Sequence, residues 1–265
     1  MIAVDLDGQR FEYEIHGDGA LVVAVRNVAA PAGMWPTPGE IAALNDAGFA
    51  LLSYQHLGTT DTIEGLAQDV AVLLEHVDRG PAALWGWSQG AMTAQELALA
   101  RPDLVSCAVM MATRGRLTAY DRARYDIEAE IGASPAGNLL GVMIQHAPDR
   151  LCDDDFFTSM LGGYGSFEPD AMAQQLRGRA NRAGRAYGEP SRLPALGGVT
   201  VPCMVVAFSH DVNIPPALNR EVADAIPDGR YVEIAGAGHS GGITHRREIR
   251  EHVHPFLASC VDPGR

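Results

Sequence analysis

Strand-length runs of apolar residues recur along this chain, and stretches with the spacing of amphipathic helices separate them. The apolar runs cover residues 21–25, 49–54, 82–87, 105–111 and 201–208. Helical spacing covers residues 37–47, 63–77, 91–100 and 217–226. A continuous apolar run is typical of a strand buried on both faces, and regular alternation with helices is typical of a parallel sheet. The pattern predicts an α/β fold with a doubly wound, mostly parallel sheet.

Two further segments complete the predicted sheet. Residues 2–5 and 10–16 alternate in part between apolar and polar positions and flank the turn signal Asp7-Gly8, so they predict a hairpin. A last strand at residues 231–234 and a last helix at residues 246–257 end the pattern.

The alternation breaks at residue 113. From there to residue 197 the sequence is polar and helical, with no buried strand, and the strand pattern then resumes. We expect this block to be a helical cap inserted over the carboxyl edge of the sheet, where α/β proteins bind ligands. The predicted organisation is a core of residues 1–112 and 198–265 and a cap of residues 113–197.

The apolar run at residues 82–87 leads into Gly86-Trp87-Ser88-Gln89-Gly90, and a helix-forming stretch follows at once. A nucleophilic serine has to stand on a sharp turn, and glycines two residues before and after it remove side chains that would collide. The following helix directs free N–H groups and the positive end of its dipole toward the turn, where a negative oxygen forms during acyl transfer. Ser88 is therefore the predicted nucleophile.

A second stretch, Gly238-His239-Ser240-Gly241-Gly242, matches the same spacing. Ser240 is separated from the last predicted strand by alternating alanines and glycines, and glycines rather than helix formers follow it. Because the strand and helix that a nucleophile turn needs are missing around Ser240, the context favours Ser88.

Charge and composition limit the classes of molecule that we expect this protein to bind. The net charge of −13 repels polyanions, so neither a nucleic acid nor an anionic membrane is expected. No apolar stretch approaches the roughly 18 residues of a membrane span, and the start lacks the basic region of a signal peptide, so we expect a cytoplasmic protein. Four cysteines, far apart in the sequence, are expected to be buried thiols rather than disulfides or metal ligands: Cys107, Cys152, Cys203 and Cys260.

A serine hydroxyl needs a base, and the base needs an orienting acid. Asp211 follows the apolar run at 201–208 and His239 follows the strand at 231–234, which gives the chain order serine, aspartate, histidine. Taken alone, Asp211 could equally cap a turn before Pro215. The other histidines are interpreted as core or surface residues. Order and strand-end position together favour a triad of Ser88, His239 and Asp211.

With these motifs the chain resembles the α/β-hydrolase fold enzymes, over nearly all of residues 1–112 and 198–260. The resemblance implies a Ser-His-Asp triad, and an oxyanion hole made by the backbone N–H of Gln89 and an N–H from the loop after Val25. Relatives usually carry His-Gly where this chain has Arg26-Asn27, which points to Val28 as the second N–H donor. Glycine there reaches positive φ, and asparagine is the best tolerated replacement.

Several other residues are candidates near the predicted site. Asn27, His56 and Trp87 are possible pocket-lining residues, although Trp87 is also expected to pack under the nucleophile. Arg26 could pair with a carboxylate of the protein or reach an anionic substrate. In the cap, a basic run and an acidic run are expected to be solvated or to pair with each other: Arg177, Arg179, Arg182 and Arg185, and Asp153, Asp154 and Asp155.

The sequence as a whole predicts a serine hydrolase that cleaves a small ester, thioester or lactone and needs no metal or cofactor. A sharper hypothesis has the arginines of the cap bind an anionic acyl donor, such as an acyl group on a carrier protein. Two alternatives stay open. A lyase or cyclase could use the Ser88-His239 pair without acylation, and a non-catalytic receptor for a small molecule could retain the triad on this fold.

Overall fold

The computed structural model describes residues 1–30, 33–164 and 170–260. The strands are β1 (Ile2–Leu6), β2 (Gln9–His16), β3 (Ala20–Val25), β4 (Phe49–His56), β5 (Ala82–Trp87), β6 (Val105–Met111), β7 (Cys203–Phe208) and β8 (Arg230–Ile234). The helices around them are α1 (Pro38–Asp46), α2 (Ile63–Val77), α3 (Gln89–Ala100), α10 (Pro216–Ala225), α11 (Gly241–Thr244) and α12 (Arg246–Cys260). Strand β7 begins later than predicted because Pro202 has no N–H for the ladder.

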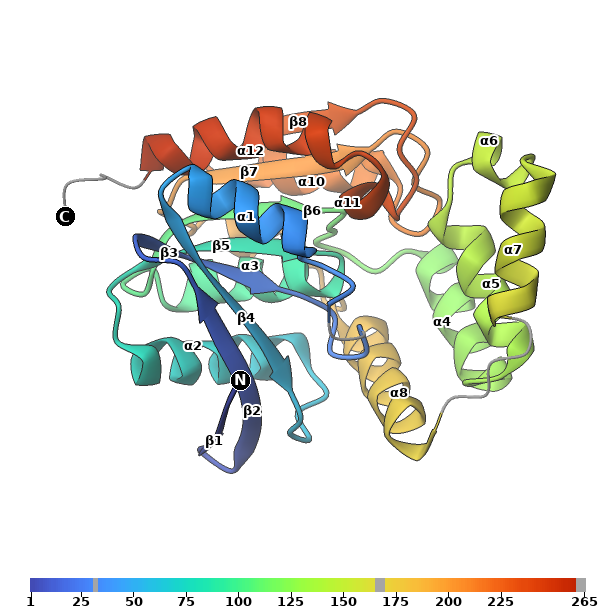
Figure 1. The fold of residues 1–265 in the computed structure, drawn as a ribbon, viewed down its shortest axis with the longest axis horizontal. Helices are drawn as coiled ribbons and strands as arrows, with labels where there is room; N and C mark the ends of the chain where they lie inside the picture. Colours follow the sequence, from blue (N-terminus) through green and yellow to red (C-terminus); the bar gives the residue numbers. More distant parts are fainter. Residues whose placement is uncertain (31–32, 165–169, 261–265) are drawn as a thin grey trace.

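The eight strands form one sheet in the order β1-β2-β4-β3-β5-β6-β7-β8 (Figure 1). β1 pairs with β2 and β2 with β4 in antiparallel register, and all the other pairs are parallel. The predicted fold class is therefore confirmed. Strand β5 lies near the middle of the sheet and is buried along its whole length, so the residue that follows it is held on a rigid support.

Helices cover both faces of the sheet. On one face, side chains of α2, α3 and α10 pack with Val23 and Leu84 in one core cluster. On the other face, side chains of α1 and α12 pack with Val22 and Trp85 in a second cluster. Neighbouring residues of one strand thus enter opposite cores, which explains the continuous apolar runs of the sequence.

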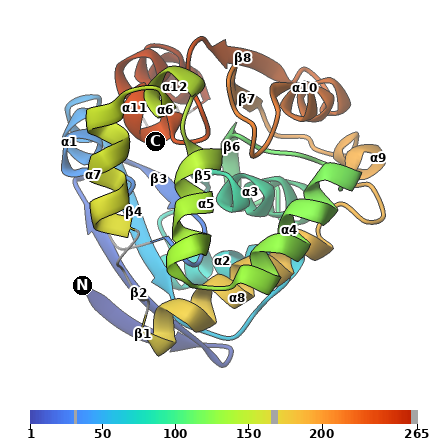
Figure 2. The same ribbon diagram turned by 90° about the vertical axis from the view of Figure 1, so that its right-hand side faces the viewer.

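Between β6 and β7 the described residues form helices and no strand. These helices are α4 (Ala119–Ile131), α5 (Pro135–Gln145), α6 (Pro148–Leu151), α7 (Asp154–Tyr164), α8 (Ala171–Ala186) and α9 (Leu193–Leu196). Figure 1 shows α4 to α8 gathered beside one edge of the sheet, and Figure 2 shows them from that side. The division into a core and a cap at residues 113–197 stays a prediction. Residues 31–32 and 261–265 of the predicted core and residues 165–169 of the predicted cap lie outside the described part.

No helix in the described part of the chain is long and apolar enough to cross a membrane.

Candidate active site

Ser88 stands on the turn between β5 and α3, with φ of 57° and ψ of −120°. This conformation is strained for a residue other than glycine, and it persists only where the surroundings hold it. The Ser88 N–H donates to the Met111 carbonyl at 2.8 Å, and the Ser88 carbonyl accepts from the Ala91 N–H at 2.9 Å. The neighbouring strand and the first turn of α3 therefore hold the serine in place.

The two glycines of this turn permit close backbone contacts. A Cβ on Gly86 would lie 2.6 Å from the carbonyl oxygen of Gly90. A Cβ on Gly90 would lie 2.6 Å from the Arg26 nitrogen and closer still to the Val25 carbonyl oxygen. Gly90 thus lets the start of α3 lie against the end of β3, where the predicted oxyanion loop begins.

Three side chains from three loops meet at the end of the sheet. The Ser88 Oγ lies 3.0 Å from the His239 Nε2, and the His239 Nδ1 lies 2.7 Å from the Asp211 Oδ2. His239 and Asp211 are 3% and 2% exposed, so water does not compete for this pair. A carboxylate accepts a hydrogen bond from Nδ1–H. This leaves Nε2 free to accept a hydrogen bond from the serine hydroxyl.

The second oxygen of the aspartate is bound by its own loop. The Asp211 Oδ1 accepts from the Asn213 N–H at 2.8 Å and from the Ile214 N–H at 2.9 Å. These two bonds fix the orientation of the carboxylate. The turn-capping role that Asp211 could have had alone is thus combined with a bond to the histidine.

The predicted oxyanion donors lie next to each other, but one of them is engaged. The Val28 N–H donates to the Gln89 side-chain Oε1 at 3.1 Å, and the Gln89 Nε2 donates to the Ala180 carbonyl of α8 at 3.0 Å. Within the described residues, nothing accepts a hydrogen bond from the backbone N–H of Gln89. The Gln89 side-chain oxygen therefore accepts the Val28 N–H bond that was expected to go to a substrate oxygen.

The explanation offered for Asn27 is wrong. Its backbone is not among the positive-φ positions of the described residues, so asparagine does not stand in for a left-handed glycine. The Asn27 Oδ1 accepts instead from the Ala29 N–H at 2.8 Å, which stabilises the loop as an Asx turn does. Asn27 lines a small hollow with Val28 and His56.

Trp87 packs under the site. Its ring centroid is 5.9 Å from that of Trp35 and 6.3 Å from that of His239, and its side chain is 7% exposed. The expectation that Trp87 packs beneath the nucleophile agrees with these contacts.

Both ring nitrogens of His56 have a hydrogen-bond partner. Its Nε2 lies 2.8 Å from the Asp69 Oδ2, and its Nδ1 lies 2.8 Å from the Arg179 Nη2. Arg179 also donates to the Thr60 carbonyl at 2.9 Å, and burial lowers its pKa. His56 therefore connects α2 to α8 of the predicted cap.

Several of the remaining charged candidates have protein partners. The Nε of Arg26 donates to the Tyr54 carbonyl at 3.2 Å, and burial lowers the pKa of Arg26. In the basic run, Arg182 pairs with Asp61 at 2.8 Å and Arg185 with Asp126 at 2.9 Å. In the acidic run, Asp153 pairs with Arg150 at 3.2 Å. The partners of these three ion pairs lie outside the two runs, so none of them joins one run to the other.

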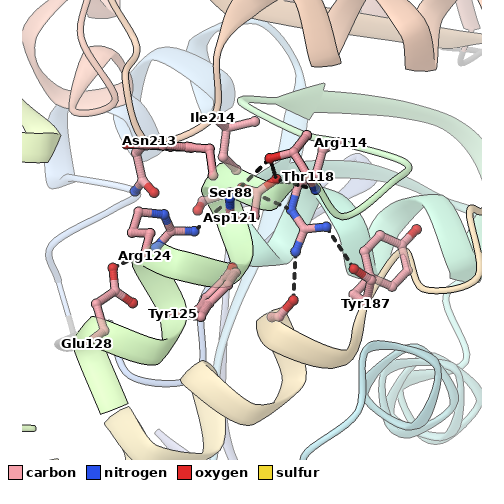
Figure 3. A network of polar contacts seen from close by, with 12 residues as sticks. Ser88, Arg114, Thr118, Asp121, Arg124, Tyr125, Glu128, Tyr187, Asn213 and Ile214 are labelled. Carbon is pink, nitrogen blue, oxygen red and sulfur yellow. Dashed lines mark hydrogen bonds and ion pairs between the residues drawn. The ribbon is translucent and has the colours of Figure 1, made fainter. Parts of the chain in front are cut away.

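A buried charged network beside the triad was missed (Figure 3). Arg114 is fully buried and donates to the carbonyls of Tyr187, at 2.7 Å, and Gly184, at 2.6 Å, at the end of α8. Asp121 lies 3.8 Å from Arg114 and 3.9 Å from Arg124. The spacing Thr118-x-x-Asp121, which forms a capping box here, could have indicated the start of α4.

This network places α4 against the acid loop. The Tyr120 hydroxyl, in the first turn of α4, donates to the Val212 carbonyl at 2.7 Å. The loop that carries Asp211 thus contacts the predicted cap directly.

Ser240 has a histidine partner of another kind. Its Oγ lies 3.0 Å from the His146 Nδ1, and its N–H donates to the Gln145 carbonyl at 2.7 Å. Burial, and secondly the cation of Arg150, lower the pKa of His146. These contacts join the histidine loop to the end of α5.

An eight-stranded α/β sheet with a serine turn at the end of a central strand is the architecture of an α/β-hydrolase-type enzyme. A sequence model of the alpha/beta hydrolase family matches residues 15–251. This chain therefore belongs to the alpha/beta hydrolase family, and it is an enzyme of that family.

Two relatives of this chain illustrate the range of that family. BpoC of Mycobacterium tuberculosis, provisionally named a non-heme bromoperoxidase, is 34% identical over 262 residues, which cover 93% of this chain and 97% of BpoC. The crystal structure of BpoC matches with a TM-score of 0.82 and 30% identity over 95% of this chain and 97% of that chain. RutD of Variovorax paradoxus, provisionally named a carbamate hydrolase, is 24% identical over 270 residues, which cover 95% of this chain and 97% of RutD.

Proposed function

We propose that this protein is a serine hydrolase that cleaves an ester, thioester or lactone of a small organic substrate through an acyl-enzyme. The observation that carries the proposal is the unbroken hydrogen-bonded chain from the Ser88 hydroxyl through His239 to Asp211. A hydroxyl becomes a useful nucleophile only when a base can take its proton as it attacks.

The proposed reaction has two halves. The Ser88 Oγ attacks the acyl carbon while the His239 Nε2 takes the hydroxyl proton, and the Asp211 carboxylate stabilises the imidazolium. The carbonyl oxygen becomes an oxyanion that accepts hydrogen bonds from backbone N–H groups at the start of α3 and on the Val28 loop. Nε2 then gives its proton to the leaving oxygen or sulfur as the acyl bond breaks. In the second half, water attacks the acyl-serine by the same route.

We also propose that residues 113–197 act as a cap that shapes the substrate pocket. Contacts at Ala180, Val212 and Gln145 support this, because each joins the insertion to one loop of the triad or oxyanion region. An acyl group on a carrier protein stays a further candidate, but the ion pairs of Arg182 and Arg185 do not favour it.

One observation keeps a second candidate in view. Because the Gln89 side chain occupies the Val28 N–H, a lyase or cyclase that needs no oxyanion hole is compatible with the same Ser88-His239 pair. The two candidates differ in whether an acyl-serine forms.

The test is turnover of a panel of nitrophenyl esters, acyl thioesters and lactones in water enriched in ¹⁸O. A separate arm contains hydrogen peroxide and bromide, because BpoC is named for that activity. We expect an acid product that carries one ¹⁸O atom, and no turnover by Ser88→Ala. Equal turnover by Ser88→Ala, or an elimination product without an acyl-serine, would overturn the proposal.

A further inference from the structure

The side chain of Gln89 is held at both ends between the oxyanion loop and the cap. Its Oε1 accepts from the Val28 N–H at 3.1 Å, its Nε2 donates to the Ala180 carbonyl at 3.0 Å, and the residue is 4% exposed. A side-chain carbonyl oxygen thus lies where the oxygen of a substrate carbonyl would have to accept.

An incoming acyl oxygen has to compete with this amide. An amide oxygen and an ester oxygen are both neutral acceptors, so the exchange gains little while the substrate is intact. The tetrahedral oxyanion carries a full charge and accepts about twice as strongly as a neutral oxygen. Displacement of the Gln89 Oε1 therefore becomes favourable as the negative charge develops.

The loop itself has little room to withdraw. Gly90 is in such close contact with Val25 and Arg26 that the base of the loop is fixed against α3. The Gln89 side chain has rotatable bonds, so it is the part that can move. Its amide nitrogen can stay on the Ala180 carbonyl while the oxygen leaves Val28, which links the occupancy of the hole to the position of α8.

We infer that Gln89 is a positioning residue that keeps the oxyanion hole occupied by its own side chain until a substrate oxygen displaces it. This inference rests on the proposed hydrolase function. It predicts that a side chain of similar volume without an acceptor at Oε1 makes Ser88 more reactive, and that a stronger acceptor makes Ser88 less reactive.

The experiment measures the second-order rate constant for labelling of Ser88 by a fluorophosphonate, whose phosphoryl oxygen enters the hole. Gln89→Met should react about 2- to 10-fold faster than the wild type, which is the range set by one competing hydrogen bond of ordinary strength. Gln89→Glu should react more slowly than the wild type, and its rate relative to the wild type at the same pH should rise as the pH falls, because the protonated acid is a weaker acceptor. KM for an ester that the enzyme turns over should change in the matching direction: lower than the wild type in Gln89→Met and higher in Gln89→Glu.

Gln95→Met is the matched control. Gln95 is a fully buried amide of the same helix, but it donates to the Thr113 hydroxyl and the Arg114 carbonyl, away from the oxyanion loop. We expect this variant to lower Tm without changing the labelling rate.

A Gln89→Met rate equal to or below that of the wild type, at unchanged Tm, would overturn the inference, because a structural support loses activity when it is removed. If Gln89→Met fails to fold, Gln89→Leu replaces it. Labelling of wild-type Ser88 without acceleration in the variants overturns this inference alone. Absence of label on Ser88 in the wild type and in the Gln89 variants overturns the hydrolase proposal together with it.

Discussion

The sequence Gly-x-Ser-x-Gly occurs twice in this chain, and the two copies fold into different structures. Ser88 has φ of 57° after the buried strand β5 and opens the long helix α3. Ser240 has φ of −72° and opens α11, a helix of four residues. The strained turn is therefore a property of the strand before the serine and the helix after it, and the five-residue pattern alone does not produce it.

The first glycine of each copy lies against backbone, but the second glycine differs between the copies. Around Ser88, Gly86 and Gly90 let backbone approach backbone at the turn and at the Val25 loop. In the second copy, a Cβ on Gly238 would lie 2.5 Å from the Ala147 nitrogen, whereas a Cβ on Gly242 would lie 3.1 Å from the Trp87 ring, under the other site. The glycines of the second copy thus let the histidine loop pack against the residues after α5 and against the Trp87 ring.

The two serines also differ in their histidine partners. The His239 Nδ1 lies 2.7 Å from the Asp211 Oδ2, so a carboxylate holds the ring from behind. His146 faces the cation of Arg150 and is partly buried, and both lower its pKa. Within the described residues no carboxylate bonds to His146, so Ser240 lacks the aspartate-backed histidine that Ser88 has.

The largest expected effect comes from making the first site resemble the second. Asp211→Asn removes the carboxylate behind His239, as His146 lacks one, and should lower kcat on the order of 10⁴-fold because the wrong imidazole tautomer is favoured. Steady-state turnover of the best ester measures this, with Asp61→Asn, in an exposed ion pair, as the control. A loss below about 10-fold would contradict an orienting role for Asp211.

Gly90→Ala and Gly242→Ala compare the second glycine of the first copy with the second glycine of the second copy. The Gly90 Cβ would meet backbone atoms that cannot move aside, so we expect a loss of about 3 kcal/mol or more in the free energy of unfolding. The Gly242 Cβ would meet a side chain at 3.1 Å, and we expect a loss of about 1 kcal/mol or less. Urea unfolding gives both values, and equal losses would show that the second glycines of the two copies are equally constrained.

Ser240→Ala should cost about 1 kcal/mol in the free energy of unfolding, because it removes one hydrogen bond to His146. Turnover should change by less than about 3-fold, since the bond is worth little and lies outside the triad. Urea unfolding and steady-state kinetics measure the two quantities. A loss of turnover comparable to that of Asp211→Asn would place Ser240 in the reaction.

The smallest effect concerns pH. The pKa of His146 in the folded protein lies below its ordinary value of 6.5, so the unfolded chain binds the proton first as the pH falls. Stability should therefore decrease as the pH falls below about 6.5. His146→Asn should flatten the dependence of the free energy of unfolding on pH.

His254→Asn is the control for this measurement, because burial lowers the pKa of His254 in the same way and its contribution should persist in the His146 variant. A pH dependence that is unchanged in His146→Asn would contradict the assignment.

The strands and the Ser88 turn could be predicted because each depends on a short run of residues. Apolar runs specify buried strands, and the order of serine, aspartate and histidine follows from the strand ends. The contacts of the Gln89 amide and of His56 could not be predicted in this way. Both depend on where α8 lies against the core, and that is decided by side chains such as Arg114 and Arg179 which meet their partners only after folding.

The measurement that tests the central claim most directly is mass spectrometry of the intact protein after reaction with a fluorophosphonate. It compares the wild type with Ser88→Ala and Ser240→Ala. We predict a single adduct in the wild type and in Ser240→Ala, and none in Ser88→Ala. An adduct that persists in Ser88→Ala and is lost in Ser240→Ala would contradict the account, because the second copy of the pattern would then carry the nucleophile.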